Sequence, residues 1–171
     1  MRFLFSFLMA FAWVAANRVH AGEVPAGWKI IQPVGARCCI TVPDSIQKSA
    51  TQPDTWIGTD ANGQSYNLSF EDQAASGTAG NDLLNSTASA IAQSKNGTIS
   101  NKKLFERYGF AACDFQLSLA GNKMALFRLV LVKRRSYLLE VDGTVTSFDP
   151  KQATIFFDSL RFYRPYSNRG K

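Results

Sequence analysis

The sequence predicts an α+β fold in which a single twisted antiparallel β-sheet carries two helices packed on it. The chain of 171 residues has a one-domain length and a globular composition, with 46% hydrophobic and 19% charged residues. Most segments alternate apolar and polar residues between short turns, as antiparallel hairpins do. Two segments instead carry apolar residues at helical spacing, and their placement among the strands favours helices packed on one sheet.

The first 21 residues have the pattern of an export signal. A basic start precedes an apolar run of 14 residues (3–16), and small or aliphatic residues occupy the −3 and −1 positions of a cleavage site. The run is too short to span a membrane, which takes about 20 residues. We therefore expect cleavage after Ala21, which leaves a periplasmic or secreted domain over 22–163 and a basic tail over 164–171.

The only histidine, His20, would leave with that signal. A chain without histidine has no Ser-His-Asp triad, no Cys-His pair and no zinc site that relies on imidazole. No nucleophile-elbow or cofactor motif occurs elsewhere. We therefore expect a protein that is not an enzyme and has no catalytic residues, no cofactor and no metal.

The first half of the domain alternates as strands do. Short strands are expected over 28–31 and 37–42, the second with Cys38, Ile40 and Val42 on one face. A hairpin follows over 55–59 and 64–71, because Asn62-Gly63 between the two segments is a strong turn signal.

A helix is expected over 82–95, where Leu84, Ala88, Ile91 and Ala92 form an apolar stripe. Asn81 is the expected N-cap, and Asn96-Gly97 ends the helix.

Four strands and a second helix complete the domain. The strands are expected over 98–107, 112–119, 123–132 and 136–141, with the polar first one at a sheet edge and the apolar third one inside the sheet. The second helix runs from Asp149 to Leu160, since Asp149 is a favoured N-cap and Pro150 suits the first helical position.

This order of elements resembles the PsbP-like family, named for an extrinsic protein of photosystem II. The resemblance lies in the strand pair over 28–42, the hairpin with Trp56-Ile57 and Tyr66-Asn67-Leu68-Ser69-Phe70, the hairpin over 123–141 with Tyr137, and the closing helix ending in Phe156-Phe157-Asp158-Ser159-Leu160-Arg161-Phe162. It implies a central antiparallel sheet flanked by helices. It also implies a binding or assembly protein, because such members are mostly not enzymes.

Two patterns of acidic residues could indicate a calcium site or a catalytic carboxylate pair. Asp60, Asn62, Gln64 and Glu71 match positions 1, 3, 5 and 12 of a calcium loop, but Ser65 stands where that loop needs glycine, so we interpret the segment as a hairpin turn.

A second pattern is the pair Glu140 and Asp142, two residues apart on a strand and therefore on one face. Such a pair suits carboxylate-dependent hydrolysis, although a solvated strand end before Gly143 is the simpler interpretation.

Positive charge is concentrated in the second half of the chain. Residues 22–94 hold three basic and seven acidic side chains, whereas residues 95–171 hold fourteen basic and six acidic ones. Lys133, Arg134 and Arg135 are consecutive at a hairpin tip, which makes them candidates to contact an anionic partner such as lipid headgroups, cell-wall polymer or an acidic protein. The alternative is a solvated tip. Export argues against nucleic acid as the partner.

The three cysteines would enter an oxidising compartment. Cys38 and Cys113 both lie on apolar faces, so a Cys38–Cys113 disulfide is the candidate, with Cys39 left free or joining two chains; three reduced thiols are the alternative.

Three functions remain open at this point. The first is an exported non-enzymatic binding or assembly protein that recognises a protein partner, for example an inhibitor or immunity protein against a secreted toxin. The second is a carrier of a small apolar or lipid-like ligand, lined by the abundant aromatic residues. The third is a carboxylate-dependent hydrolase.

Overall fold

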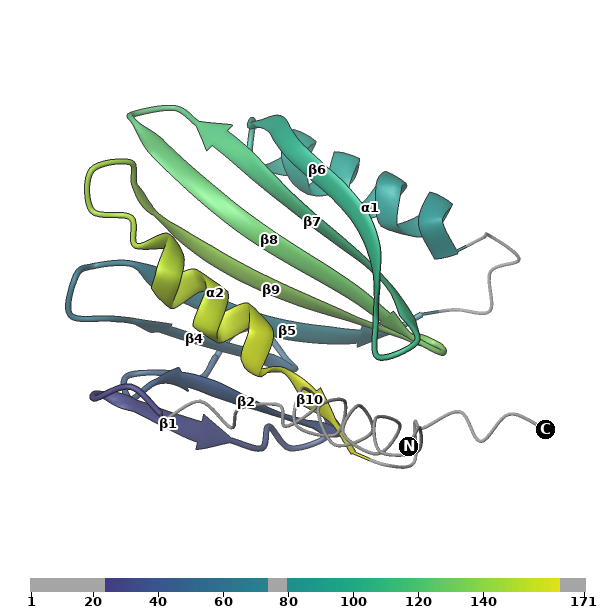
Figure 1. Cartoon of the computed structure of the whole chain (residues 1–171), viewed down its shortest axis with the longest axis horizontal. Coiled ribbons are helices and arrows are strands. Elements are labelled where there is room, and N and C mark those ends of the chain that lie inside the picture. The colour runs from purple at the N-terminus through teal and green to yellow at the C-terminus, as the bar shows by residue number, and fades with distance from the viewer. Residues whose placement is uncertain (1–23, 74–79, 164–171) are drawn as a thin grey trace, which may run out of the picture.

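The computed structural model describes residues 24–73 and 80–163 of the chain (Figure 1). Within these ranges it contains two helices and ten strands, which form two antiparallel sheets. The expected export signal (1–21) and the basic tail (164–171) lie outside the described residues. No helix in the described ranges is long and apolar enough to cross a membrane.

A seven-stranded sheet forms the centre of the fold, and every neighbouring pair in it is antiparallel. Its strands, in spatial order, are β3 (Gln47–Lys48), β4 (Thr55–Thr59), β5 (Ser65–Asp72), β9 (Arg135–Thr144), β8 (Lys123–Val132), β7 (Phe110–Leu119) and β6 (Thr98–Arg107). The polar strand β6 is an edge strand, as its composition predicted. A register shift between Ser100 and Lys103 interrupts its pairing with β7, and such a bulge discourages edge-to-edge association.

The expectation of a single sheet is wrong, because a second sheet of three strands lies beside the large one. It contains β1 (Trp28–Ile31), β2 (Cys38–Pro43) and β10 (Arg161–Phe162), in the order β1-β2-β10. β2 ends at Pro43, which has no N–H to extend a ladder, and the chain then turns so that β3 pairs with β4 instead. Gly58 allows this turn to approach β4 closely, since a Cβ there would lie 2.6 Å from the Cα of Ile46.

One hydrophobic core joins the two sheets to helix α2 (Pro150–Ser159). In Figure 1, α2 crosses the near face of the large sheet at β9 and β5. This core takes the inward residues of β2, β5 and β9 and the apolar face of α2, namely Cys38, Ile40, Val42, Tyr66, Leu68, Phe70, Tyr137, Leu139, Val141, Ala153, Phe156 and Phe157. The alternation predicted for β2 is therefore confirmed.

A second core lies on the opposite face of the large sheet, under helix α1 (Gly80–Ser94). It is built from one face of α1 and from residues of β7 and β8, namely Leu84, Ala88, Ala92, Cys113, Phe115, Leu117, Ala125, Phe127 and Leu129. The helix contacts strands β6, β7 and β8, so it covers only one side of the sheet.

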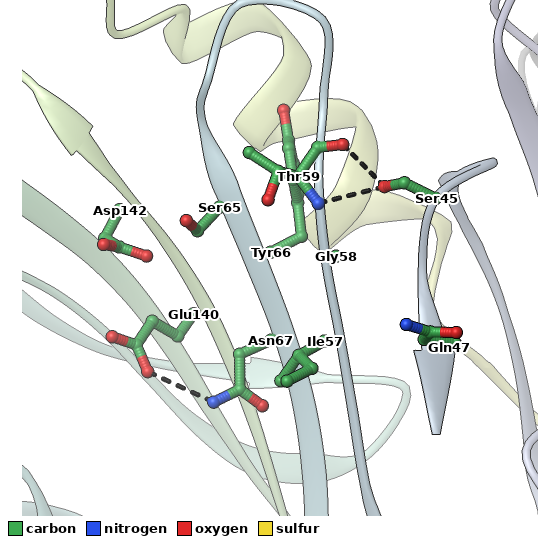
Figure 2. A pocket seen from close by; sticks show the side chains of 10 residues that line it. All are labelled: Ser45, Gln47, Ile57, Gly58, Thr59, Ser65, Tyr66, Asn67, Glu140 and Asp142. Atoms are coloured by element: carbon green, nitrogen blue, oxygen red, sulfur yellow. Dashed lines mark hydrogen bonds between the residues drawn. The ribbon is translucent and has the colours of Figure 1, made fainter. Parts of the chain in front are cut away.

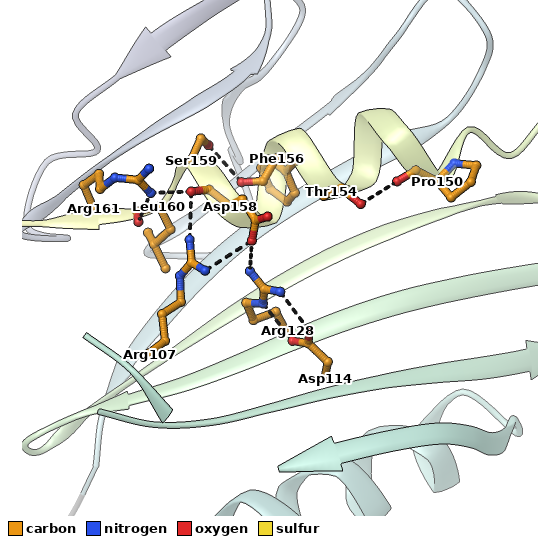
Figure 3. A network of polar contacts seen from close by, with 10 residues as sticks. All are labelled: Arg107, Asp114, Arg128, Pro150, Thr154, Phe156, Asp158, Ser159, Leu160 and Arg161. Atoms are coloured by element: carbon orange, nitrogen blue, oxygen red, sulfur yellow. Dashed lines mark hydrogen bonds and ion pairs between the residues drawn. The ribbon is translucent and has the colours of Figure 1, made fainter. Parts of the chain in front are cut away.

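A buried arginine fastens α2 to the large sheet (Figure 3). The guanidinium of Arg128, on β8, donates to both carboxylate oxygens of Asp114 at 2.7 Å and to Asp158, near the end of α2, at 2.7 Å. It also lies 5.3 Å from the ring centroids of Phe105 and Phe157. Because Arg128 is only 8% exposed, these contacts orient α2 on the sheet.

Helix α1 ends at a recognisable local signal. At the end of α1, Asn96 adopts a left-handed conformation and donates to Gln93, while Gly97 donates to Ala92, which is a Schellman motif. The helix begins at Gly80, so Asn81 lies inside the first turn and is not the predicted N-cap.

The start of α2 matches its prediction. The Asp149 carboxylate accepts from the N–H groups of Lys151 and Gln152, and Pro150 occupies the first helical position. The N–H of Asp149 itself donates to Gln64 at 2.7 Å, which ties the cap to β5.

We predict that Asp149→Ala lowers the free energy of unfolding by about 0.5–2 kcal/mol, because the first-turn N–H groups lose their acceptor. Asp149→Asn keeps an acceptor oxygen and is the control. We expect its free energy of unfolding to fall by much less than that of Asp149→Ala. Denaturant unfolding of the three proteins measures this, and equal midpoints for wild type and Asp149→Ala would contradict the cap.

Candidate functional site

The candidate site is the part of the large sheet that α1 leaves uncovered. Residues paired across an antiparallel ladder share a face, and Glu140 and Asp142 of β9 pair with Phe127 and Ala125, which belong to the core under α1. Asn67 of β5 in turn pairs with Glu140. The side chains of β9, β5 and β4 on this face are mostly polar, so the apolar surface under α1 gives way to a polar one.

A shallow pocket of about 500 Å³ lies on this open face (Figure 2). Strands β4, β5 and β9 form its floor, and the segment that leads into β3 forms one wall. The lining residues are Ser45, Gln47, Ile57, Gly58, Thr59, Ser65, Tyr66, Asn67, Glu140 and Asp142.

Glu140 is the most buried charged group in the pocket, at 5% exposure. Its carboxylate forms an ion pair with the ammonium of Lys95 at 2.6 Å, and the ammonium also lies 5.8 Å from the ring centroid of Phe127. Lys95 follows the last residue of α1, so the end of the helix supplies the neutralising charge. A buried carboxylate needs such a partner, because removing a charge from water is costly.

Asn67 lies beside Glu140 and presents an unusual group. Its Nδ2 is 3.5 Å from Oε2 of Glu140, which orients the amide. Its Oδ1 is buried and has no hydrogen-bond partner among the described residues. A buried acceptor without a donor costs free energy in the unliganded protein, so the pocket floor is incompletely satisfied.

Asp142 is the second acidic group of the pocket. Burial raises its pKa above the ordinary value of 3.8, even though Lys95 and Lys123 both oppose the shift. The ionised carboxylate is therefore disfavoured in the free protein, and an approaching cation would stabilise it.

The wall formed by the segment before β3 is held in place by Ser45. Its hydroxyl donates to the carbonyl of Thr59 at 2.5 Å and accepts from the N–H of Thr59 at 2.9 Å. These bonds hold the segment before β3 against the end of β4. The pocket thus has fixed walls and a floor rich in hydrogen-bond acceptors, a chemistry that suits a cationic group with several N–H donors.

The sequence predicted that Glu140 and Asp142 share a face, and both do line this pocket. The interpretation as a solvated strand end is wrong for Glu140, because β9 continues to Thr144 and Lys95 covers the carboxylate. Sequence reasoning missed Lys95 and Asn67. The polar positions that alternate with Tyr66, Leu68 and Phe70 were the available signal for Asn67.

The calcium-like segment is a hairpin turn, as interpreted. One oxygen of Asp60 accepts from the N–H groups of Asn62 and Gln64, at 2.8 and 3.0 Å, and the other accepts from the Tyr66 hydroxyl at 3.1 Å. These bonds close the link between β4 and β5. In the described ranges, no group of three or more His, Cys, Asp or Glu side chains could hold a metal ion.

The basic tip predicted to contact an anion lies between β8 and β9. Lys133, Arg134 and Arg135 all border a small pocket there, together with Arg37 from the loop before β2. Arg135 is engaged within the chain, since its guanidinium donates to both carboxylate oxygens of Asp72, at 2.6 and 2.8 Å.

The expected Cys38–Cys113 disulfide is absent, and both thiols are free. The sequence placed both on apolar faces correctly, but the faces belong to different cores: Cys38 faces the core of α2, and Cys113 faces the core of α1 across the large sheet. Burial raises the pKa of both thiols, that of Cys38 to about 12. Cys39 is partly exposed.

The sequence matches no family model and no curated protein. Solved structures match the fold. The cyanobacterial PsbP (CyanoP) of Synechocystis sp. PCC 6803 has a TM-score of 0.61 at 8% identity, covering 84% of this chain and 96% of that one. The Saccharomyces cerevisiae Ran-binding protein Mog1p has a TM-score of 0.54 at 8% identity, covering 79% and 95%. A Bacteroides thetaiotaomicron protein has a TM-score of 0.55 at 12% identity, covering 81% of this chain and 49% of its own.

At these identities the matches show the fold alone. They confirm the expected resemblance to PsbP at the level of an α+β architecture with a large antiparallel sheet and two helices.

We predict that Asp142→Asn stabilises the unliganded protein at pH 7. A carboxyl whose pKa is raised by folding keeps its proton more tightly in the folded state, so stability falls as pH rises past the ordinary value of 3.8. The neutral amide removes that loss. Thermal unfolding should give a higher midpoint for Asp142→Asn at pH 7 and equal midpoints at a pH below 3.8.

Glu106→Gln, at an exposed position on β6, is the control and should show no such difference. A lower midpoint for Asp142→Asn at pH 7 would mean that Lys95 and Lys123 make the carboxylate stabilising instead.

We also predict that unfolding the unreduced monomer exposes three reactive thiols, whereas the folded protein exposes only Cys39. Buried thiols with raised pKa values form little thiolate and react slowly. Cys39→Ser should leave no fast-reacting thiol in the folded state and two after unfolding. A single reactive thiol in the unfolded wild-type protein would instead indicate that a Cys38–Cys113 disulfide has formed.

Proposed function

We propose that this chain is an exported, non-enzymatic protein that recognises a protein partner through the open face of its large sheet. The observation that carries the proposal is the acceptor-rich pocket on that face, where a buried Glu140 and a destabilised Asp142 lie beside Asn67. Polar groups that cost stability in the free protein are typical of binding sites, because the partner relieves the cost. Its acceptors favour a basic side chain of the partner.

The structural neighbours support the same class of function. Mog1p is described as a Ran-binding protein, which is an example of protein binding by this fold. A shared fold does not carry a partner from one protein to another, so the partner here is argued from the pocket. An inhibitor or immunity protein against a secreted toxin is one form that this function takes.

The two other functions have weaker support. For a hydrolase, the ion pair between Glu140 and Lys95 removes one of the two carboxylates that such chemistry needs free. For an apolar carrier, the aromatic side chains would have to line a cavity. Several instead contact one another, as Tyr66 does with Trp28 and Phe156 at centroid distances of 5.2 and 5.4 Å.

Two isoleucines provide a matched test. Ile57 lies on the pocket floor and is 44% exposed, while Ile155 lies on α2 and is 38% exposed. Ile57→Arg places a cation in the pocket, where it repels a basic partner and blocks the floor, whereas Ile155→Arg makes the same chemical change elsewhere.

In co-purification from the native cell envelope, wild type and Ile155→Arg should retain the same partner, and Ile57→Arg should lose it. Calorimetry with that purified partner should then show at least tenfold weaker binding for Ile57→Arg only. Recovery of the protein alone, or equal binding by all three proteins, would contradict the proposal.

A further inference from the structure

The two-residue link between β6 and β7 presents an exposed tyrosine in a strained conformation. Tyr108 and Gly109 have φ values of 52° and 77°, and positive φ at both positions is typical of a type I′ hairpin turn. Such turns favour Asn, Asp and Gly, because a bulky side chain is strained in the left-handed region. Tyr108 is the one aromatic residue with a positive φ in the described part of the chain, and it is 51% exposed. Neither the turn nor a hydrophobic core requires a tyrosine here.

Two guanidinium groups hold the ring of Tyr108. Those of Arg107, on β6, and Arg161, on β10, lie 4.9 and 5.5 Å from its centroid, within the range of cation–π contacts. Both arginines also donate to the carbonyl of Asp158 near the end of α2 (Figure 3). The ring and the two cations are therefore fixed relative to α2, and little ordering is needed when a partner binds.

Arg161 keeps unused hydrogen-bonding capacity. Its Nη1 donates to the carbonyls of Asp158 and Leu160, and its Nε and Nη2 donate to no acceptor among the described residues. Arg161 also forms no ion pair there. A guanidinium presents its N–H groups in a planar fork that can bind both oxygens of one carboxylate. The geometry of Arg161 therefore suits a carboxylate that this part of the chain does not supply.

Guanidinium groups outnumber carboxylates around the end of α2. Arg128 pairs with Asp114 and Asp158, and Arg107 shares Asp158 at 3.2 Å. Burial lowers the pKa of Arg107, and the charges of Arg128 and Arg161 lower it further, while Asp158 opposes the shift. Two carboxylates thus serve three guanidinium groups, and an additional carboxylate would be attracted here.

Two further charged residues of β6 lie nearby. Lys103 adds a cation to this face of the sheet, because it pairs with Asp114 across the ladder between β6 and β7. Glu106 belongs to the opposite face of β6, since side chains alternate along a strand. The face that surrounds Arg107 is therefore net positive.

We propose that Tyr108, Arg107 and Arg161 form an interface for an acidic segment of a protein partner. Tyrosine and arginine are enriched among the residues that dominate the binding energy of protein interfaces. A carboxylate of the partner pairs with the open N–H groups of Arg161, and the adjoining chain packs on the ring of Tyr108. The strain at Tyr108 is retained because it presents the ring to the partner.

This interface lies on the α2 side of the large sheet, as the contacts with Asp158 show. The acceptor-rich pocket lies on the face that carries α1. The two sites therefore take partner groups of opposite charge on opposite faces, and this inference does not depend on the function proposed for the pocket.

The probe for the test is a fluorescently labelled hexa-glutamate peptide with blocked ends, and hexa-glutamine is the uncharged reference. The full chain is titrated into each peptide at fixed ionic strength, and fluorescence anisotropy reports binding. The site variants are Arg161→Gln and Tyr108→Asn, the second of which leaves the net charge unchanged. The control variant is Lys151→Gln, which removes one positive charge from an exposed position at the other end of α2.

Wild type and Lys151→Gln should bind hexa-glutamate saturably and hexa-glutamine not at all. Arg161→Gln and Tyr108→Asn should bind hexa-glutamate at least tenfold more weakly. Thermal unfolding of Tyr108→Asn should give a midpoint at least equal to that of wild type, because relief of the left-handed strain offsets the lost ring contacts. A variant that is stable but does not bind separates a binding role from a structural one.

Four results would overturn the proposal. Equal affinity of wild type for the two peptides would remove the role of the carboxylate, and equal losses in Arg161→Gln and Lys151→Gln would reduce the effect to net charge. A lower midpoint for Tyr108→Asn would make the tyrosine a structural residue of the turn. Retention on phosphatidylglycerol vesicles without peptide binding would assign the surface to a membrane instead of a protein.

Discussion

The position of α2 depends on one buried guanidinium. Arg128 joins β7, through Asp114, to the end of α2, through Asp158, and it also contacts the rings of Phe105 and Phe157. Replacing such a buried ion pair by apolar residues is often neutral for stability, whereas removing one partner is costly. The ion pairs of Arg128 therefore contribute mainly to the orientation of α2. Arg107 and Arg161 also donate to the carbonyl of Asp158, which places cations at the negative end of the helix dipole. Once α2 is oriented, Ser159 accepts from the N–H of Thr41, and the small sheet is positioned in turn.

The open face follows from the width of the sheet. Seven strands at about 4.8 Å spacing span about 29 Å, whereas one helix with its side chains is about 10–12 Å wide. On the face opposite α2, α1 covers β6, β7 and β8, and the described residues place no other helix there. The uncovered strands must then be polar, as Ser65 and Asn67 are. Lys95 at the end of α1 lies at the boundary between the two regions and neutralises the nearest buried carboxylate.

Much of the fold could be predicted from local signals in the sequence. Asn62-Gly63 marked the hairpin, Asp149 marked the start of α2, and the alternation along β2 assigned its buried face, because each depends on neighbours in the chain. Contacts between distant segments could not be predicted in this way. The two-residue strand β10 pairs with β2 because α2 ends beside that strand. The prediction of a Cys38–Cys113 disulfide was wrong because alternation identifies an apolar face without showing which core that face belongs to.

The same distinction applies to the two sites. The sequence placed Glu140 and Asp142 together, and it placed Lys133, Arg134 and Arg135 together, because each set is local. It contained no signal for Lys95 against Glu140 or for Arg37 at the hairpin tip, since both depend on how the helix and the loop before β2 pack.

Strand β9 carries both pockets, one at each end, and their opposite charges can coexist because they are far apart. Asp142 follows Arg135 by seven residues, which is about 23 Å along an extended strand. That separation is almost three times the screening length of about 8 Å at physiological ionic strength. The charges of the basic tip therefore hardly weaken the attraction of a cation to the acceptor-rich pocket. A variant in the acceptor-rich pocket consequently tests that pocket, with little influence from the charges at the other end of the strand.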